Sequence, residues 1–452
     1  MARTLISIAQ LLIAVALLET GSGLQGVVVP LEARTMGFSN LAIGLLGSGY
    51  YGGFILGCLA VPALIHRVGH IRAFAGFSSL VAAGLLAHTL LMTDALWFGL
   101  RMVVGFGFAG LYIATESWLN DLAPTATRGR VLAAYMLVSW AALIAGKLAF
   151  GWAGPVDSVP LVLAAIAVSL AILPVAFTTM QAPGAQAGAP PVLGRLLAVS
   201  PVGVLGCLGV GVANGTFWTL APLFAEAGGL DAMGVGLFMA VAILGSVFTQ
   251  WPLGWWSDRV DRRKVIVFTC LFASISGVVL AGSFGRDAHV LQIAAFAFGA
   301  SALPVYSLCV AHANDYAPNQ AFIEVSSLLL LVFSLGAVIG PPVASLVMDM
   351  AGPAGVFLFT AGVHATLVVL VLIAISAGRA ASQAEKGAFV AVPRTTQAVL
   401  ALDPRAAGSG APGDVATLGE TEGEPPAVRD GAGFNGERGP EEKETPGDPP
   451  PA

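Results

Sequence analysis

Twelve long apolar stretches dominate this sequence of 452 residues and restrict what it can fold into. Each stretch is long enough to cross the hydrocarbon core of a bilayer, which takes about 20 helical residues. Only 10% of the residues are charged, whereas a soluble domain carries about 25%. The stretches lack the alternation of membrane-barrel strands, and a continuous apolar run satisfies its backbone only as a helix. We therefore predict an all-α membrane protein with twelve transmembrane helices.

The predicted helices follow one another with short connections. The first stretch begins like a secretion signal, but it continues apolar to Val29 without a convincing cleavage site, so we expect a retained helix. The twelve predicted spans are residues 5–29, 41–64, 71–93, 95–119, 129–153, 158–180, 200–225, 233–256, 264–285, 288–313, 321–348 and 353–377.

A sequence pattern repeats at a separation of about 192 to 194 residues. Arg67 corresponds to Arg259, and Asp121, within an Asn-Asp-Leu-Ala-Pro run, corresponds to Asp315 within Asn-Asp-Tyr-Ala-Pro. Small apolar residues match by chance in any hydrophobic chain, but the Asn-Asp-x-Ala-Pro match is harder to explain in that way. We predict two six-helix bundles joined by a Pro- and Gly-rich cytoplasmic linker, at residues 1–180, 200–377 and 181–199, respectively.

The remaining residues, 378–452, differ in composition from the rest of the chain. They contain 7 Lys and Arg against 12 Asp and Glu, which accounts for the whole net charge of −5. They are rich in Pro, Gly, Ala and Glu and offer little to bury, so we expect a disordered cytoplasmic tail.

Lys and Arg in short loops predict the orientation of the helices. If the N-terminus is cytoplasmic, the outer side receives only Arg34 and Arg286. We therefore expect both termini in the cytoplasm. The inner side then receives Arg3, Arg67, Arg72, Arg128, Arg130, Arg195, Arg259, Arg262, Arg263 and Lys264.

The loop after the eighth predicted helix carries a dense pattern of charges. The stretch Gly-Trp-Trp-Ser-Asp-Arg-Val-Asp-Arg-Arg-Lys at residues 254–264 resembles the signature loop of the major facilitator superfamily, G-x-x-x-D-R-x-G-R-R/K. Asp261 stands where that motif has its second glycine. The resemblance covers residues 5–377 and implies a secondary transporter of a bacterial twelve-helix branch, built from two pseudo-symmetric six-helix bundles.

An acidic residue at the start of this loop is suited to act as an electrostatic latch. Asp258 lies at a helix end, beside a basic loop and the dipole of a neighbouring helix, and can hold two cytoplasmic helix ends together. The corresponding loop of the first half has His66 at the acidic position, so we expect a weaker latch there. The alternative is a generic basic loop, which explains the arginines but not Asp258.

Further charged residues occupy matching cytoplasmic ends of the two halves. We expect them to form gating contacts rather than to bind substrate. The predicted gate comprises His66, Arg67, Arg72, Glu116, Asp121, Arg128, Arg130, Asp258, Arg259, Arg262, Arg263, Asp315 and Glu324.

Three charged residues lie inside predicted spans, where each costs at least about 2.5 kcal/mol at the membrane centre. Glu19 is near the middle of the first helix, and Arg101 and Lys147 are in the outer parts of the fourth and fifth. Arg101 and the glycines after it resemble the superfamily's R-x-x-x-G-x-G motif, which implies a cavity position tied to proton coupling. We expect Glu19 to pair with Arg101 and to carry the proton; a purely structural ion pair is the alternative.

Lys147 has two interpretations that the sequence leaves open. It makes the cavity of the first half electropositive, which suits an anionic or zwitterionic substrate, or it extends toward the outer surface. Other polar residues are candidates to line the cavity, although interfacial or interhelical hydrogen bonding explains them equally well. These are Gln25, Tyr50, Tyr51, Asn214 and Trp218.

The resemblance implies alternating-access transport of a small solute, driven by protons, across a bacterial inner membrane. The alternative is a non-transporting receptor or a membrane-embedded enzyme on the same fold, because a fold does not determine a function. The sequence has no HExxH, P-loop or paired metal-ligand spacing, so we expect no enzyme activity, metal or cofactor. We expect a monomer in the lipid bilayer whose partners are a small molecule and protons, with no nucleic acid.

Overall fold

The computed structural model describes residues 2–402, except 91–92, 124–126, 154–157, 178–199, 317–321, 379–386, 388 and 392–394. The predicted linker at 181–199 and residues 403–452 therefore lie outside the described residues. The first half comprises α1 (Ala2–Thr35), α2 (Asn40–Val68), α3 (His70–His88), α4 (Asp94–Leu122), α5 (Arg128–Trp152), α6 (Ser158–Leu170) and α7 (Ile172–Ala176). The second half comprises α9 (Pro201–Ala227), α10 (Ala232–Arg259), α11 (Arg262–Gly282), α12 (Ala288–Ala302), α13 (Val305–Asn314), α14 (Phe322–Ala351) and α15 (Gly355–Ala377).

Within the described residues, these helices form twelve spans long and apolar enough to cross a membrane, which confirms the prediction. One span comprises α6 and α7, and another comprises α12 and α13. The second interruption follows from Pro304, which has no N–H to continue the ladder of α12. Side chains cap other helices: Ser39 and Asp231 accept hydrogen bonds from the backbone N–H groups of Ala42 and Gly234 at the starts of α2 and α10.

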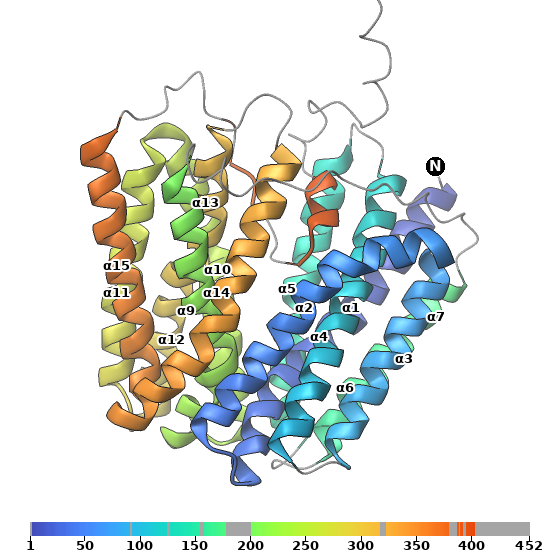
Figure 1. Cartoon of the computed structure of the whole chain (residues 1–452), viewed down its shortest axis with the longest axis horizontal. Coiled ribbons are helices and arrows are strands. Elements are labelled where there is room, and N and C mark those ends of the chain that lie inside the picture. Colours follow the sequence, from blue (N-terminus) through green and yellow to red (C-terminus); the bar gives the residue numbers. More distant parts are fainter. Residues whose placement is uncertain are drawn as a thin grey trace, which may run out of the picture. The chain divides into compact units, whose positions relative to one another are not determined.

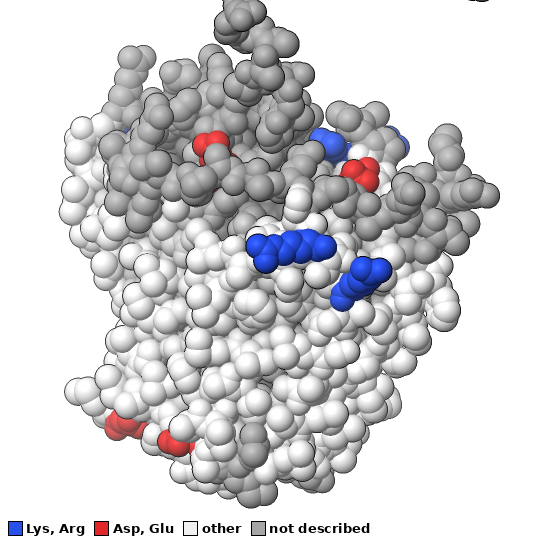
Figure 2. All heavy atoms as spheres, turned by 45° about the vertical axis from the view of Figure 1, so that its right-hand side comes forward, with Lys and Arg blue, Asp and Glu red and all other residues white. Residues whose placement is uncertain are grey.

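The two halves lie side by side, and their helices alternate in direction (Figure 1). We call the end that carries the N-terminus and the α2–α3 loop the N-terminal face, and the other end the opposite face. On the side shown in Figure 2, basic groups lie in the upper part of the surface and acidic groups near its lower edge, with an uncharged band between them. Such an uncharged belt is what a bilayer core requires of the residues facing it.

The halves touch each other near the opposite face. The Asn40 side chain donates to Asp349 of α14 at 2.6 Å, and the Ser48 hydroxyl donates to the Val338 carbonyl at 2.5 Å. Gly44 packs directly on the backbone of Pro341, because a Cβ on Gly44 would lie 2.8 Å from the Pro341 carbonyl oxygen. These contacts join α2 to α14 and close the space between the halves at this end.

Within the first half, glycines bring two helix pairs into backbone contact. A Cβ on Gly105 of α4 would lie 2.0 Å from the Tyr50 carbonyl oxygen of α2. A Cβ on Gly146 of α5 would lie 2.2 Å from the Thr20 carbonyl oxygen of α1. Small residues allow such approaches, which stabilise membrane helix pairs through van der Waals packing. Because Thr20 and Gly146 adjoin Glu19 and Lys147, the second contact places these charges on neighbouring turns.

Disorder is expected for residues 378–452, but residues 387, 389–391 and 395–402 of this range are described in the structure and are ordered. Gln397–Leu402 form a 3-10 helix, η2, which packs against α4, α5 and α14 near the N-terminal face (Figure 1). Thr396, Val399, Leu400 and Leu402 are buried there. The composition of the tail as a whole obscured this short apolar run, which becomes favourable only when a groove is available to cover it.

The glycine contacts make a prediction about stability. Replacing Gly105 by Ala should destabilise the protein by about 1–3 kcal/mol, because the new methyl group forces α2 and α4 apart. Gly99→Ala, on the same helix but with nothing within 4 Å of its Cβ position, is the matched control. Thermal unfolding of the detergent-purified protein, followed by tryptophan fluorescence, measures both. Equal unfolding temperatures for the two variants would contradict the packing argument.

Candidate functional site

A cavity of about 240 Å³ lies between the halves, lined by side chains from α1, α2, α4 and α5 on one side and α9, α10, α13 and α14 on the other. This volume is at the small end of ligand pockets, so it suits a small solute. Its three charged residues, Glu19, Arg101 and Lys147, all come from the first half. The second half contributes uncharged side chains, among them Trp218 and Gln250.

Arg101 is buried and is held by α1 and α2. Its Nη1 donates to Gln25 Oε1 at 2.5 Å, and its Nε donates to the Leu46 carbonyl at 3.5 Å. Its guanidinium lies over the Tyr50 ring, 4.6 Å from the ring centroid. The close approach of α2 and α4 at Gly105 allows this stacking, which stabilises a cation through the quadrupole of the ring.

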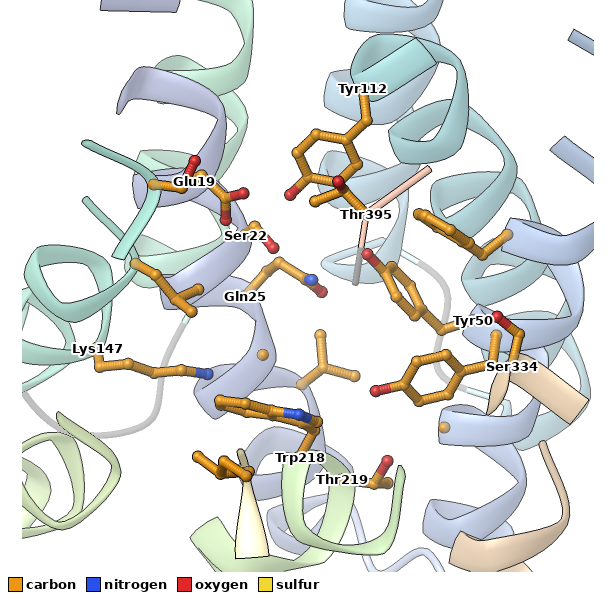
Figure 3. A pocket seen from close by; sticks show the side chains of 18 of the residues that line it. Glu19, Ser22, Gln25, Tyr50, Tyr112, Lys147, Trp218, Thr219, Ser334 and Thr395 are labelled. Carbon is orange, nitrogen blue, oxygen red and sulfur yellow. The ribbon is translucent and has the colours of Figure 1, made fainter. Parts of the chain in front are cut away.

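Lys147 extends into the cavity rather than toward the outer surface. Only 2% of its surface is exposed, and Nζ lies 5.5 Å from the centroid of the Trp218 ring. A Cβ on Gly26 would lie 3.0 Å from Nζ, so this glycine leaves room for the ammonium group. Figure 3 shows Lys147 and Glu19 entering the pocket from one side and Tyr50 from the other.

Glu19 is buried beside the hydroxyl group of Tyr112, with which it hydrogen-bonds, and it interacts electrostatically with Lys147. The ion pairs found among the described residues do not include the expected pair of Glu19 with Arg101. Arg101 binds Gln25 of α1 instead, and Glu19 contacts the same helix α4 further along, at Tyr112. The sequence gives the depth of each charge in its helix but not the side to which it points.

Four of the five uncharged candidates line the cavity: Gln25, Tyr50, Tyr51 and Trp218. Asn214 is not among the lining residues; it is buried, and neither atom of its amide has a hydrogen-bond partner among the described residues. Sequence analysis missed several lining residues because uncharged side chains such as Ser, Thr, Met and Tyr are common in membrane helices and carry no distinctive signal. Among these are Ser22, Tyr112, Met136, Ser139, Thr219, Ser246, Ser307, Ser334 and Thr395.

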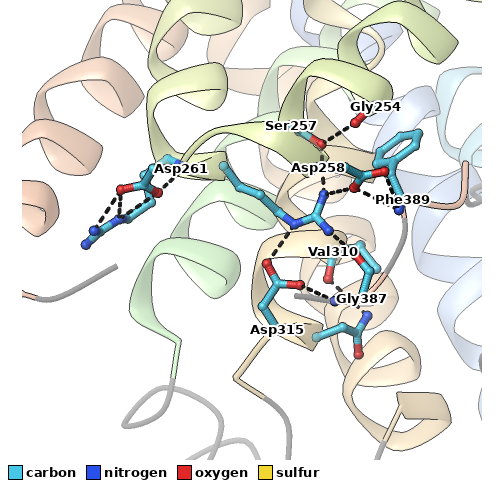
Figure 4. Close-up of polar contacts among 11 residues, drawn as sticks. Gly254, Ser257, Asp258, Asp261, Val310, Asp315, Gly387 and Phe389 are labelled. Atoms are coloured by element: carbon cyan, nitrogen blue, oxygen red, sulfur yellow. Dashed lines mark hydrogen bonds and ion pairs between the residues drawn. The ribbon is translucent and has the colours of Figure 1, made fainter. Parts of the chain in front are cut away.

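A second polar cluster lies at the N-terminal face of the second half (Figure 4). Arg262, only 1% exposed, pairs with Asp258 at 2.9 Å and with Asp315 at 2.6 Å. It also donates to the Ser257 hydroxyl at 2.8 Å. The helix ends of α10, α11 and α13 are thereby joined by one guanidinium, whose several donors suit it to this role.

The neighbouring charges of the loop have other partners. Arg263 pairs with Asp261 at 2.9 Å, and Arg259 lies over the Trp255 ring, 3.7 Å from its centroid. Partial burial raises the pKa of Asp261, but hydrogen bonds from Arg263 outweigh it and hold that pKa below its usual value. Asp261 also caps α11, which explains why this position accepts an acidic residue in place of glycine.

In the first half, the predicted gate residues are mostly dispersed. Glu116 is fully buried and accepts a hydrogen bond from Tyr135 at 2.5 Å. Arg128 is half-buried, and its Nε has no hydrogen-bond partner among the described residues. The other predicted gate residues of this half, together with Glu324 of the second half, are exposed: His66, Arg67, Arg72, Asp121, Arg130 and Glu324.

A family model described as the Major Facilitator Superfamily matches residues 11–250 and 203–408. The chain belongs to the major facilitator superfamily. It is therefore a multi-pass membrane transporter. The chain is similar to two MFS-type transporters. The first, YcaD of Salmonella typhimurium, is 27% identical over 369 aligned residues, which cover 80% of this chain and 92% of YcaD. A second, from Enterobacter sp. strain 638, is 28% identical over 342 residues, 75% of this chain and 86% of the relative.

Solved structures of the superfamily share the fold. The nucleoside transporter NupG superposes with a TM-score of 0.64 at 14% identity, covering 82% of this chain and 99% of NupG. A bacterial homologue of the human lysosomal transporter Spinster superposes with a TM-score of 0.64 at 16% identity. The superposition covers 84% of this chain and 97% of the homologue. The Escherichia coli fucose:proton symporter FucP superposes with a TM-score of 0.53 at 18% identity. The superposition covers 82% of this chain and 98% of FucP. At these identities the likeness shows the fold alone.

The second half thus holds the ion-pair cluster of the signature loop, Arg262 with Asp258 and Asp315. Equivalent substitutions in the two halves can test how much this cluster contributes to stability. Asp315 binds buried Arg262, so Asp315→Asn should lower stability by about 1.5–3 kcal/mol, the usual worth of a hydrogen bond to a charged group. Its repeat counterpart Asp121 is exposed, and Asp121→Asn should leave stability unchanged. Thermal unfolding in detergent measures both, and comparable losses for the two variants would be incompatible with the asymmetry described above.

Proposed function

We propose that this superfamily member moves a small anionic or zwitterionic solute by proton-coupled alternating access. The observation that supports the substrate class is the presence of two buried cations, Arg101 and Lys147, facing one cavity over aromatic rings. Neither forms an ion pair with a carboxylate within the described part of the chain. The two cations share the cavity with one carboxylate, Glu19, so one buried positive charge has no counter-charge there, and a carboxylate or phosphate on the solute offsets its cost.

Glu19 is the proposed proton carrier. It is the only carboxylate among the residues lining the cavity, and it interacts with Lys147 across the same space. A solute anion that binds Lys147 weakens the hold of the ammonium on Glu19, so that Glu19 takes up a proton more readily. Solute and proton then enter together. FucP, which shares this fold, is a fucose:proton symporter, and this agrees with proton coupling here.

The proposed transport cycle uses the two faces in turn. Contacts near the opposite face, such as Asn40 with Asp349, hold the halves together there. Breaking them while the halves approach at the N-terminal face would expose the cavity on the other side. Because basic loop residues concentrate at the N-terminal face, we place it and both termini in the cytoplasm of a bacterial inner membrane. The transporter acts as a monomer, since its cavity lies within one chain.

The substrate class can be tested with a thermal-shift screen of carboxylates, phosphates, amino acids, sugars and nucleosides. An anionic or zwitterionic compound should stabilise the purified protein, by about 2.7 kcal/mol at one hundred times its dissociation constant. Lys147→Met should abolish that shift, because it keeps the length of the side chain and removes the charge. Lys264→Met, at an exposed lysine, should preserve it. Stabilisation by neutral sugars alone, or an undiminished shift in Lys147→Met, would rule out the proposed class.

Proton coupling can be tested in proteoliposomes with a compound identified by that screen. Glu19→Gln should lose accumulation driven by a pH gradient but retain counterflow, because exchange needs no net proton movement. Asp94→Asn, at an exposed carboxylate at the start of α4, is the control and should behave as wild type. Full uphill transport by Glu19→Gln would exclude Glu19 as the carrier. A receptor or enzyme on this fold would show no counterflow in any variant.

A further inference from the structure

The C-terminal segment that follows α15 returns to the membrane-spanning helices. We call residues 387, 389–391 and 395–402 the tail segment. Its η2 helix contacts α4 and α5 of the first half and α14 of the second (Figure 1). One of its residues, Thr395, lines the central cavity (Figure 3). The tail segment is therefore part of the cavity wall toward the N-terminal face.

In the second half, the tail segment binds the acidic residues of the signature-loop cluster (Figure 4). The Phe389 N–H donates to Asp258 at 2.9 Å, and the Gly387 N–H donates to Asp315 at 3.2 Å. Arg262 donates to the Gly387 carbonyl. A Cβ on Gly254 would lie 2.1 Å from a ring carbon of Phe389, so the first glycine of the signature loop makes room for this ring.

In the first half, the tail segment binds a buried carboxylate. The Thr396 hydroxyl donates to Glu116, whose other oxygen accepts from Tyr135. The Gln397 side-chain amide donates to the Cys58 carbonyl of α2 at 3.2 Å. Glu116 has no exposed surface, and a buried carboxylate needs hydrogen-bond donors. The hydroxyl of Thr396 in the tail segment is one of these donors.

Apolar contacts complete the docking of the tail segment. Val399 is 1% exposed, and Leu400 and Leu402 are equally buried. Water is excluded from these side chains by helices of both halves, and this burial favours the docked position. Polar and apolar contacts together attach one short segment to both sides of the space that opens onto the cavity.

We propose that the tail segment is an autoinhibitory plug that closes the cavity at the N-terminal face and must leave before solute can pass. Because it is bonded to both halves, it also holds them at one separation and opposes the rocking that alternating access requires. Its anchors are Asp258, Asp315 and Glu116, and it docks on Asp258 and Asp315 while both keep their pairs with Arg262. Release of the plug thus opens the path and leaves the Arg262 cluster intact.

The plug can be tested without knowing the substrate, by the reactivity of a cysteine in the cavity. Ser139→Cys places a thiol among the lining residues, and the four native cysteines are buried. A membrane-impermeant methanethiosulfonate is added to proteoliposomes from the N-terminal face, and the parent chain without Ser139→Cys provides the background. The rate is compared in the full chain, in a chain ending at residue 386, and in a control chain ending at Ala411, which retains the tail segment.

If the plug is released in about one full-length molecule of ten, the thiol reacts at about a tenth of its free rate. We therefore expect the chain ending at residue 386 to react about tenfold faster than the full chain. The chain ending at Ala411 should react as slowly as the full chain. Full-length Val399→Asp, which puts a charge into the apolar contact, should react as fast as the shorter truncation and decides the matter if that truncation does not fold. Equal rates in the full chain and in the chain without the plug, or in the full chain and Val399→Asp, would overturn the proposal. A fast reaction of the chain ending at Ala411 would do so as well.

Discussion

The close approach of α1 to α5 and of α2 to α4 determines where the charges of this protein lie. Glycines such as Gly105 and Gly146 allow backbone contact between these helices. The residues next to those contacts then face a common space: Glu19 beside Lys147, and Arg101 beside Tyr50. A charge in a membrane must find a partner, an aromatic face or water. Helix packing places an aromatic ring beside each cation of the cavity, Tyr50 beside Arg101 and Trp218 beside Lys147.

The second half uses its charges differently. Its buried arginine, Arg262, is satisfied by two carboxylates at the N-terminal face, and its contribution to the cavity is uncharged. Ion pairs of this kind fix the relative position of helix ends, whereas unpaired cations in a cavity leave a site for another anion. The repeated architecture therefore places its charges differently in the two halves. One half holds the groups suited to binding a solute, and the other holds a rigid cluster at the mouth.

The ordered part of the tail contacts both the cavity and this cluster. It binds the carboxylates Asp258 and Asp315 of the cluster through its backbone, and it reaches the cavity wall with Thr395. Backbone N–H groups are well suited to this, because they can bind carboxylates whatever side chains surround them. A chain segment that docks by such contacts can leave without disrupting the helices, since the pairs of Arg262 with Asp258 and Asp315 remain in place.

The sequence alone determined the membrane class, the twelve spans and the superfamily, because long apolar runs and a charged loop motif are local features that survive without knowledge of packing. It also identified Glu19, Arg101 and Lys147 as the charges to examine, since each is expensive where it lies. Tertiary structure alone decided that Arg101 binds Gln25 rather than Glu19, that Lys147 enters the cavity, and that Asn214 does not line it. The rotation of each helix about its axis settles those contacts, and that rotation depends on how all twelve spans pack together. The docking of η2 was also decided by tertiary structure alone. A short apolar run is stable only where helices far apart in sequence form a groove to bury it.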